Sequence, residues 1–156
     1  MSVALADHTG PWTADDVEAL PDAGDHARFE VYEGGVLVVS PAPGVGHQRA
    51  SYWLHSALAQ AALAAGADAE VPEAVNVALP VGKLLVPDVV VVEAGAVGET
   101  TTRIPCDAVL AVVEVVSPST VSIDRAVKAG PRPVCHPDHA RGRNPGPHHP
   151  ALRGRA

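Results

Sequence analysis

Hydrophobic and polar positions alternate over residues 28–32, and a second short segment, residues 36–40, is almost wholly hydrophobic. Such alternation is typical of β-strands that cover one face. The sequence Glu-Gly-Gly between them supplies turn residues, so the two segments are expected to form a hairpin. Glu30 then lies on the strand face opposite its two apolar neighbours. This pattern alone favours a solvent-exposed Glu30. The alternative is that Glu30 points inward and joins two other acids at a metal site.

A helical spacing replaces this alternation from His47 to about Ala65. Apolar residues recur three and four positions apart, which predicts one apolar stripe along an amphipathic helix. Gly66 is expected to end this helix. The predicted stripe comprises Ala50, Trp53, Leu54, Ala57, Leu58 and Ala61.

A shorter helix is predicted near the N-terminus. Thr13 can cap it, and Asp15 and Asp16 suit the positive end of its dipole. This helix is expected to end by Pro21, because proline restricts the backbone of the residue before it.

Three further strands are predicted over residues 71–79, 84–93 and 108–116. The second contains the run Val89–Val92, and the third contains Val109–Val113. Because neither run alternates with polar residues, both faces of each strand are expected to be covered. Together these elements predict a compact α/β domain.

Two acidic residues stand out against this apolar background. Glu114 interrupts the last valine-rich strand, and Asp88 follows a proline at the head of the run Val89–Val92. Either could be an ordinary residue at a strand end or in a turn. If the two strands are neighbours, however, the carboxylates can meet and form a hard oxygen site suited to Mg²⁺ or Mn²⁺. Such a metal polarises a phosphate and lowers the pKa of a bound water.

Two other residues are candidates for contact with a phosphate. Lys128 is either an exposed helix lysine or a cation that stabilises the transition state of phosphate hydrolysis. His47 stands at the start of the long helix after Gly44-Val45-Gly46. It is either a helix-start residue without a further role or a phosphate contact at the helix end.

The composition suits one domain with an aliphatic core. The chain has 156 residues, of which 47% are hydrophobic and 3% aromatic. No run reaches the roughly 18 apolar residues that a membrane helix needs. The first ten residues lack the features of a signal peptide, so a cytoplasmic location is expected. Cys106 and Cys135 have neither metal-type nor redox-type spacing, which predicts reduced thiols.

The net charge of −7 conceals two unlike parts of the chain. Residues 1–125 carry 5 Lys and Arg against 17 Asp and Glu, a net charge of −12, whereas residues 126–156 carry 6 against 1, or +5. An acidic body does not attract nucleic acid over long range. An activity on DNA must therefore depend on a local site.

Several motifs, in this order, resemble those of the Uma-type putative restriction endonucleases of the PD-(D/E)xK nuclease superfamily. The resemblance covers about Trp12 to Lys128. The motifs are Glu30 with the Gly34-Gly35 turn, Val38-Val39-Ser40-Pro41-Ala42-Pro43 with His47, Val86-Pro87-Asp88, Val113-Glu114-Val115-Val116-Ser117-Pro118-Ser119-Thr120, and Asp124-Arg125-Ala126-Val127-Lys128.

The resemblance implies a restriction-endonuclease-like core with a mixed central sheet flanked by helices. It implies that Asp88 and Glu114 bind Mg²⁺ or Mn²⁺, that Glu30 is a further acid, and that Lys128 is the catalytic lysine. It implies DNA as the substrate. The absence of a long apolar run predicts no membrane partner, and a homodimer is an open alternative. No lysine lies two residues after Glu114, where Val116 stands, so the lysine is expected on the following helix.

The chain departs from this family after Lys128, where the family continues with more helix and an aromatic strand. From Gly130 onward there are six prolines, four histidines and no aromatic residue. We divide the chain into a flexible N-terminus (1–10), a nuclease-like domain (11–128) and a disordered tail (129–156). We hypothesise that a frameshift produced the tail. Resequencing the gene tests this, because a one-base slip should restore the missing helix and strand.

Three functions remain open on the sequence. The first is a metal-dependent endonuclease. The second is an inactive, C-terminally truncated remnant that keeps the acids but lacks the closing helix and strand. The third is a non-catalytic module that binds nucleic acid, against which the acidic body argues.

Overall fold

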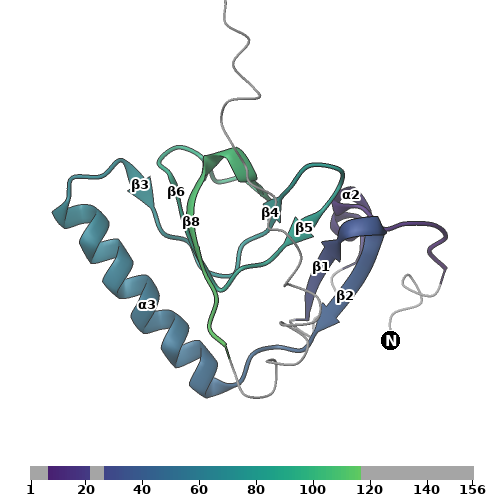
Figure 1. The fold of residues 1–156 in the computed structure, drawn as a ribbon, viewed down its shortest axis with the longest axis horizontal. Coiled ribbons are helices and arrows are strands. Elements are labelled where there is room, and N and C mark those ends of the chain that lie inside the picture. Colours follow the sequence, from purple (N-terminus) through teal and green to yellow (C-terminus); the bar gives the residue numbers. More distant parts are fainter. Residues whose placement is uncertain (1–6, 22–26, 117–156) are drawn as a thin grey trace, which may run out of the picture.

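The computed structural model describes residues 7–21 and 27–116. Within them lie two α-helices, two 3₁₀ turns and eight strands, which confirms the predicted mixture of helices and a mixed sheet (Figure 1). The predicted helix over residues 122–128 and the tail lie outside the described residues. The elements are α2 (Ala14–Glu18), β1 (Arg28–Tyr32), η1 (Glu33–Gly35), β2 (Val36–Ser40), α3 (Val45–Ala64), β3 (Ala69–Glu70), β4 (Val77–Ala78), β5 (Leu84–Leu85), β6 (Val89–Glu93), β7 (Ile104–Pro105), η2 (Cys106–Ala108) and β8 (Val109–Val113).

The predicted hairpin is confirmed as β1 and β2, which pair antiparallel from Arg28 opposite Ser40 to Tyr32 opposite Val36. Gly35 in the connecting turn has a φ of 72°, which favours glycine. A Cβ at Gly35 would lie 2.4 Å from the Cβ of Pro11. Glycine is therefore needed here for the N-terminal segment to pack against the hairpin.

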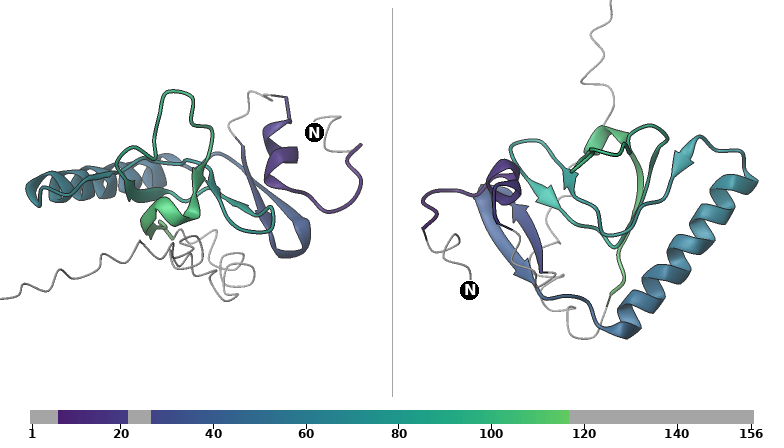
Figure 2. Two further views of the ribbon diagram at one scale, coloured as in Figure 1. Left: turned by 90° about the horizontal axis from the view of Figure 1, so that it is seen from above. Right: turned by 180° about the vertical axis from the view of Figure 1, so that it is seen from behind.

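The strands form two sheets rather than one. The larger sheet has the order β2-β1-β5-β4-β7, with β4 and β7 parallel and its other pairs antiparallel. The smaller sheet has the order β3-β6-β8 and is antiparallel. The hairpin and α3 lie at opposite ends of the molecule, with β6 and β8 between them (Figures 1 and 2).

Two of the predicted strands are each split between these sheets. The segment 84–93 divides into β5 and β6 because Pro87 has no N–H to donate to a ladder. The segment 71–79 lacks a continuous strand. Pro72 interrupts it, and Ala74 adopts a φ of 49°, which no extended strand permits. The chain therefore crosses between the sheets just before β6, at Val86-Pro87-Asp88.

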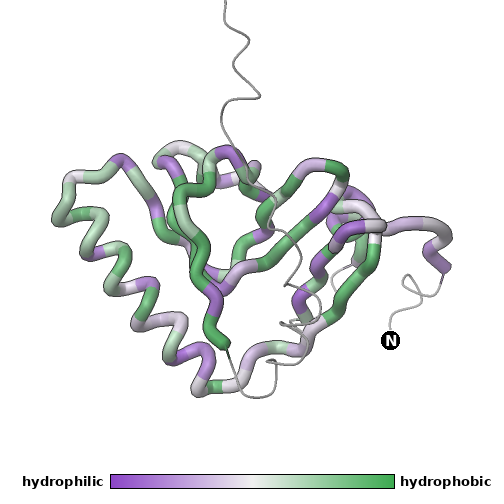
Figure 3. Tube along the Cα trace, in the orientation of Figure 1, coloured by the Kyte–Doolittle hydropathy of each residue, from purple (hydrophilic) through white to green (hydrophobic). Residues whose placement is uncertain are grey.

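The central strand of the smaller sheet is β6, and the prediction that both of its faces are covered is confirmed. Val89, Val90 and Val92 are fully buried. The same prediction for β8 is wrong, because Leu110 is 57% exposed and Val112 is 41% exposed. Within the described residues β8 pairs with β6 alone, so its apolar sequence (Figure 3) lies at a sheet edge.

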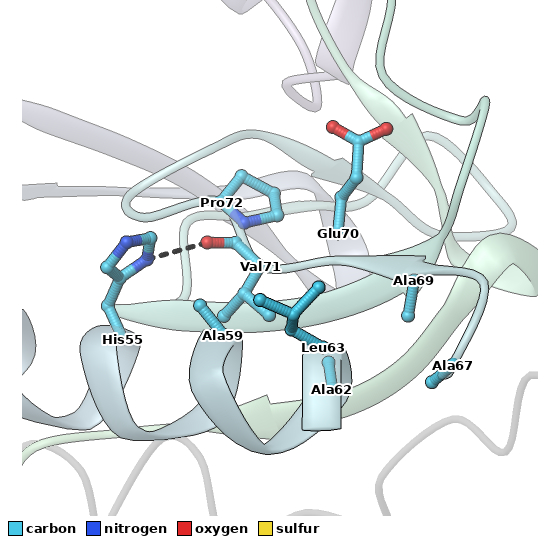
Figure 4. A pocket seen from close by; sticks show the side chains of 9 residues that line it. All are labelled: His55, Ala59, Ala62, Leu63, Ala67, Ala69, Glu70, Val71 and Pro72. Carbon is cyan, nitrogen blue, oxygen red and sulfur yellow. Dashed lines mark hydrogen bonds between the residues drawn. The ribbon is translucent and has the colours of Figure 1, made fainter. Parts of the chain in front are cut away.

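The long helix α3 is confirmed, although it begins at Val45, two residues before the predicted start. The predicted apolar stripe is not its buried side, since Trp53 on that stripe is 64% exposed. Instead, Ser51 is buried and His55 Nδ1 donates a 2.7 Å hydrogen bond to the carbonyl oxygen of Val71 (Figure 4). The helix therefore packs on the β3 segment with the side that carries His55 and Ala59.

The short helix α2 begins as predicted. Thr13 and Asp16 form a capping box, in which the Asp16 N–H donates to Thr13 Oγ1 and the Thr13 N–H donates to Asp16 Oδ2. The pKa of Asp16 lies below its ordinary value, first because the Thr13 hydroxyl donates a 2.6 Å hydrogen bond to Asp16 Oδ2 and second because the Thr13 N–H donates to the same oxygen. The helix packs through Ala14 against Leu84 at the base of the larger sheet.

Cys106 in η2 is disulfide-bonded, so the prediction of a reduced thiol at this position is wrong. Cys135 lies outside the described residues. Disulfides are typical of oxidising compartments, and the cytoplasmic location stays a prediction. Neither helix of the described segments has both the length and the apolar character needed to cross a bilayer.

Candidate functional site

Asp88 is the centre of the candidate site. It immediately precedes β6, and its side chain is only 2% exposed. Three nitrogen groups surround the carboxylate. Arg28 Nη1 lies 2.5 Å from Oδ1, while His47 Nε2 lies 3.0 Å and the Val115 backbone nitrogen 2.8 Å from Oδ2. Three nitrogen groups from different parts of the chain therefore converge on this one buried carboxylate.

These partners come from three separate parts of the fold. Arg28 begins β1, His47 lies in the first turn of α3, and Val115 follows β8. Figures 1 and 2 show the start of α3 and the end of β8 at the same end of the molecule. The site therefore lies where the first strand, the long helix and the last described strand converge.

Glu114 lies beside Asp88. Strands β6 and β8 pair antiparallel with Val89 opposite Val113, so one further step of the same register brings Asp88 opposite Glu114. Residues opposite each other in an antiparallel pair have side chains on the same face, with Cβ atoms about 4.5–5.5 Å apart. Glu114 is half-buried. The predicted proximity of the two acids thus follows from strand pairing.

Glu30 is buried, so the prediction that it faces solvent is wrong. Its side chain accepts hydrogen bonds from the Val86 N–H at 3.0 Å and from the Tyr32 hydroxyl at 3.1 Å. Arg28 and Glu30, two residues apart on β1, share one strand face. Both therefore reach the segment 86–88, so Glu30 supports the backbone that carries Asp88.

His47 contacts the carboxylate of Asp88. An ionised carboxylate only accepts hydrogen bonds, so this contact favours a proton on Nε2. The other ring nitrogen, Nδ1, is buried and has no hydrogen-bond partner within the described ranges. The ring therefore presents one nitrogen to Asp88 and keeps a second that is available to a further group.

Lys128 lies outside the described residues, and its predicted role stays a prediction. Within residues 7–21 and 27–116, no group of three or more His, Cys, Asp or Glu side chains is arranged to hold a metal. The structure brings His47 into contact with Asp88, and the extended register of β6 and β8 places Glu114 opposite Asp88. Glu30 is bonded to the backbone two residues before Asp88.

Arg28, which makes the shortest contact to Asp88, was not predicted from the sequence. A signal was present, because Arg28 stands two residues before Glu30 and so points from the same strand face. Two backbone donors were not predicted either: the Val86 N–H, which bonds Glu30, and the Val115 N–H, which bonds Asp88. Backbone donors carry no side-chain signature, so no sequence pattern identifies them.

Comparisons with known proteins bear on the fold and the family of this chain. The chain is similar to the crystal structure of a putative nuclease belonging to DUF820 from Anabaena variabilis ATCC 29413, with a TM-score of 0.54 and 18% sequence identity. The similarity covers 76% of this chain and 67% of that chain, and it shows that the two share a fold. No curated relative matches the chain.

A family model also matches most of the domain. It covers residues 14–130 and is described as Uma2, putative restriction endonuclease. This range spans the hairpin, the long helix and both acid-bearing strands, so the resemblance read from the motifs is confirmed. The chain belongs to the Uma2 family of putative restriction endonucleases.

Proposed function

We propose that this protein is a divalent-metal-dependent endonuclease that hydrolyses phosphodiester bonds in DNA. Family membership and the nuclease-like fold support a nuclease. The observation that carries the metal-dependent reaction is the position of Asp88. This buried carboxylate lies opposite Glu114 in the strand register, at a point where three elements converge.

The residues present fit Mg²⁺ or Mn²⁺. Both ions prefer oxygen ligands, and Mg²⁺ in phosphate-processing sites takes one or two carboxylates and completes its shell with water and substrate phosphates. Asp88 and Glu114 supply such a pair of carboxylates. When bound, the metal would supply Lewis-acid polarisation of the phosphate and a bound water with a lowered pKa.

The other residues of the site have supporting roles in this proposal. The Val115 N–H holds the carboxylate of Asp88 in one orientation, which keeps the ligand pre-organised. Glu30 acts through the Val86 N–H and fixes the backbone before Asp88. Lys128 would stabilise the charge that develops on the scissile phosphate.

DNA must approach an acidic protein in this proposal. Residues 1–125 carry a net charge of −12, so they repel phosphates over long range. Positive charge is supplied by the metal at the site and by the six basic residues from 126 onward. Cleavage is therefore expected to weaken strongly when the metal is chelated.

The test is cleavage of supercoiled plasmid DNA in Mg²⁺ or Mn²⁺ by the full chain and by two variants. Glu114→Ala removes the proposed ligand, whereas Glu93→Ala removes an exposed acid from the other end of β6. We expect cleavage by the unmodified protein and by Glu93→Ala, and none by Glu114→Ala. Equal cleavage by all three proteins would remove the proposed site.

The same assay separates the two rival functions. A remnant without activity would leave the plasmid intact in both metals, with a broad thermal unfolding transition. A binding module would retard DNA in a gel without any metal. Either result would overturn the proposed hydrolysis.

A further inference from the structure

Arg28 makes the shortest polar contact in the site. Its Nη1 lies 2.5 Å from Oδ1 of Asp88, and its side chain is 21% exposed, whereas that of Asp88 is 2% exposed. Arg28 is thus the partner nearer to solvent, and Asp88 is the one held inside. If the pair separates, Arg28 is the residue with room to move.

The two oxygens of Asp88 differ in their remaining capacity. Oδ2 is contacted by both His47 and the Val115 N–H, which accounts for its two lone-pair directions. Arg28 alone is seen at Oδ1 among the described residues. A metal ligated by Asp88 would therefore bind at Oδ1, beside the guanidinium that occupies one of its two lone-pair directions.

We propose that Arg28 is a positioning residue that competes with the divalent metal for Oδ1 of Asp88 and so sets the metal affinity of the site. The inference rests on the proposed metal site. A cation and a divalent metal on one oxygen repel each other, and the repulsion is strong where water is excluded. Metal binding therefore requires the guanidinium to withdraw toward solvent, and the free energy of the lost ion pair reduces the affinity.

A purely structural ion pair makes the opposite prediction. If Arg28 only stabilises the fold, removing it lowers stability and leaves Mn²⁺ affinity unchanged or weaker, because Asp88 becomes less well ordered. If Arg28 competes with the metal, removing it increases the affinity even where stability falls. Metal affinity and stability therefore separate the two roles.

The experiment is direct titration of the full chain with Mn²⁺ at pH 8 without DNA, with free Mn²⁺ measured by electron paramagnetic resonance. Arg28→Gln is compared with Arg49→Gln, which removes an exposed arginine from α3 two residues after His47. We expect Arg28→Gln to bind Mn²⁺ about 10- to 100-fold more tightly, as the loss of a charge-assisted hydrogen bond allows. Arg49→Gln should stay within about twofold, since surface charges act weakly.

Equal or weaker binding by a folded Arg28→Gln overturns the inference. Should that variant fail to fold, Arg28→Lys decides the question. A lysine keeps the charge but loses the planar fork, so its affinity should rise by a smaller factor, and an unchanged affinity contradicts competition. Asp88→Asn should abolish binding.

Failure of the inference and failure of the proposed function are distinguishable. Mn²⁺ binding that Asp88→Asn abolishes but Arg28→Gln leaves unchanged overturns only the competition. An absence of Mn²⁺ binding in every protein, the unmodified chain included, overturns the metal site and the inference with it.

Discussion

The backbone N–H of Val115 donates a 2.8 Å hydrogen bond to Oδ2 of Asp88, across 27 positions of sequence. The bond lies just beyond the last ladder pair, Val89 and Val113, and ties the chain after β8 to the residue before β6. Because Glu114 directly precedes Val115, this bond holds the two acidic residues side by side. Strand pairing and ligand placement are thus one feature of the fold.

Asp88→Asn should abolish most of the cleavage activity. The amide keeps an oxygen for one N–H donor but loses the charge that binds a metal, so we expect at least about a 100-fold lower rate of plasmid cleavage. The rate is compared with that of Glu93→Ala, measured under the same conditions. A variant that cleaves at more than about one tenth of the normal rate would contradict metal binding by Asp88.

Glu30 is expected to act mainly through stability. Glu30→Ala leaves the Val86 N–H without its acceptor in a buried position, which should lower the free energy of unfolding by about 1–3 kcal/mol in urea denaturation. Glu30→Gln keeps an acceptor oxygen and should lose less. If Glu30→Gln is as stable as the unmodified protein yet inactive, Glu30 is an acid of the active site rather than a support.

Leu84 and Leu110 offer a matched test of where the core lies. Leu84 is fully buried against Val31 and Ala14, while Leu110 on the β8 edge is 57% exposed. Leu84→Ala should lower the free energy of unfolding by about 2–5 kcal/mol, and Leu110→Ala by no more than about 0.5 kcal/mol. A large loss at Leu110 would show that the exposed side of β8 is covered in solution.

The capping box of α2 predicts a pH dependence on the acid side. The pKa of Asp16 is lowered in the folded protein, so the ionised form favours folding. This stability is present above the ordinary pKa of 3.8 and is lost as the pH falls through the lower folded value. The loss of thermal stability between pH 6 and pH 2 should therefore be smaller in Thr13→Ala than in the unmodified protein.

Thr13→Ser is the control for that experiment. A serine hydroxyl can accept from the Asp16 N–H and donate to its carboxylate as threonine does. The serine variant should keep the pH profile of the unmodified protein. A profile that Thr13→Ala leaves unaltered would mean that the capping box does not shift the titration of Asp16.

The sequence predicted those elements whose formation depends on interactions between residues close together in the chain. The hairpin was predictable because alternation and a Gly-Gly turn act over a few residues. The long helix was predictable because twenty residues without an internal proline or a run of β-branched side chains can close every turn. The sequence drew attention to Asp88 and Glu114 because a carboxylate beside a valine-rich strand needs a partner, and their role as metal ligands stays a prediction.

The sequence by itself determined the hairpin, the long helix and the family. Only the tertiary structure decided which side of α3 is buried, which strands form which sheet, that Glu30 faces inward, and that Arg28 covers Asp88. Each of these depends on contacts between residues tens of positions apart, such as Arg28 and Asp88 at a separation of 60. Local patterns indicate on which face of a segment each side chain lies, and only tertiary packing determines which neighbour that side chain contacts.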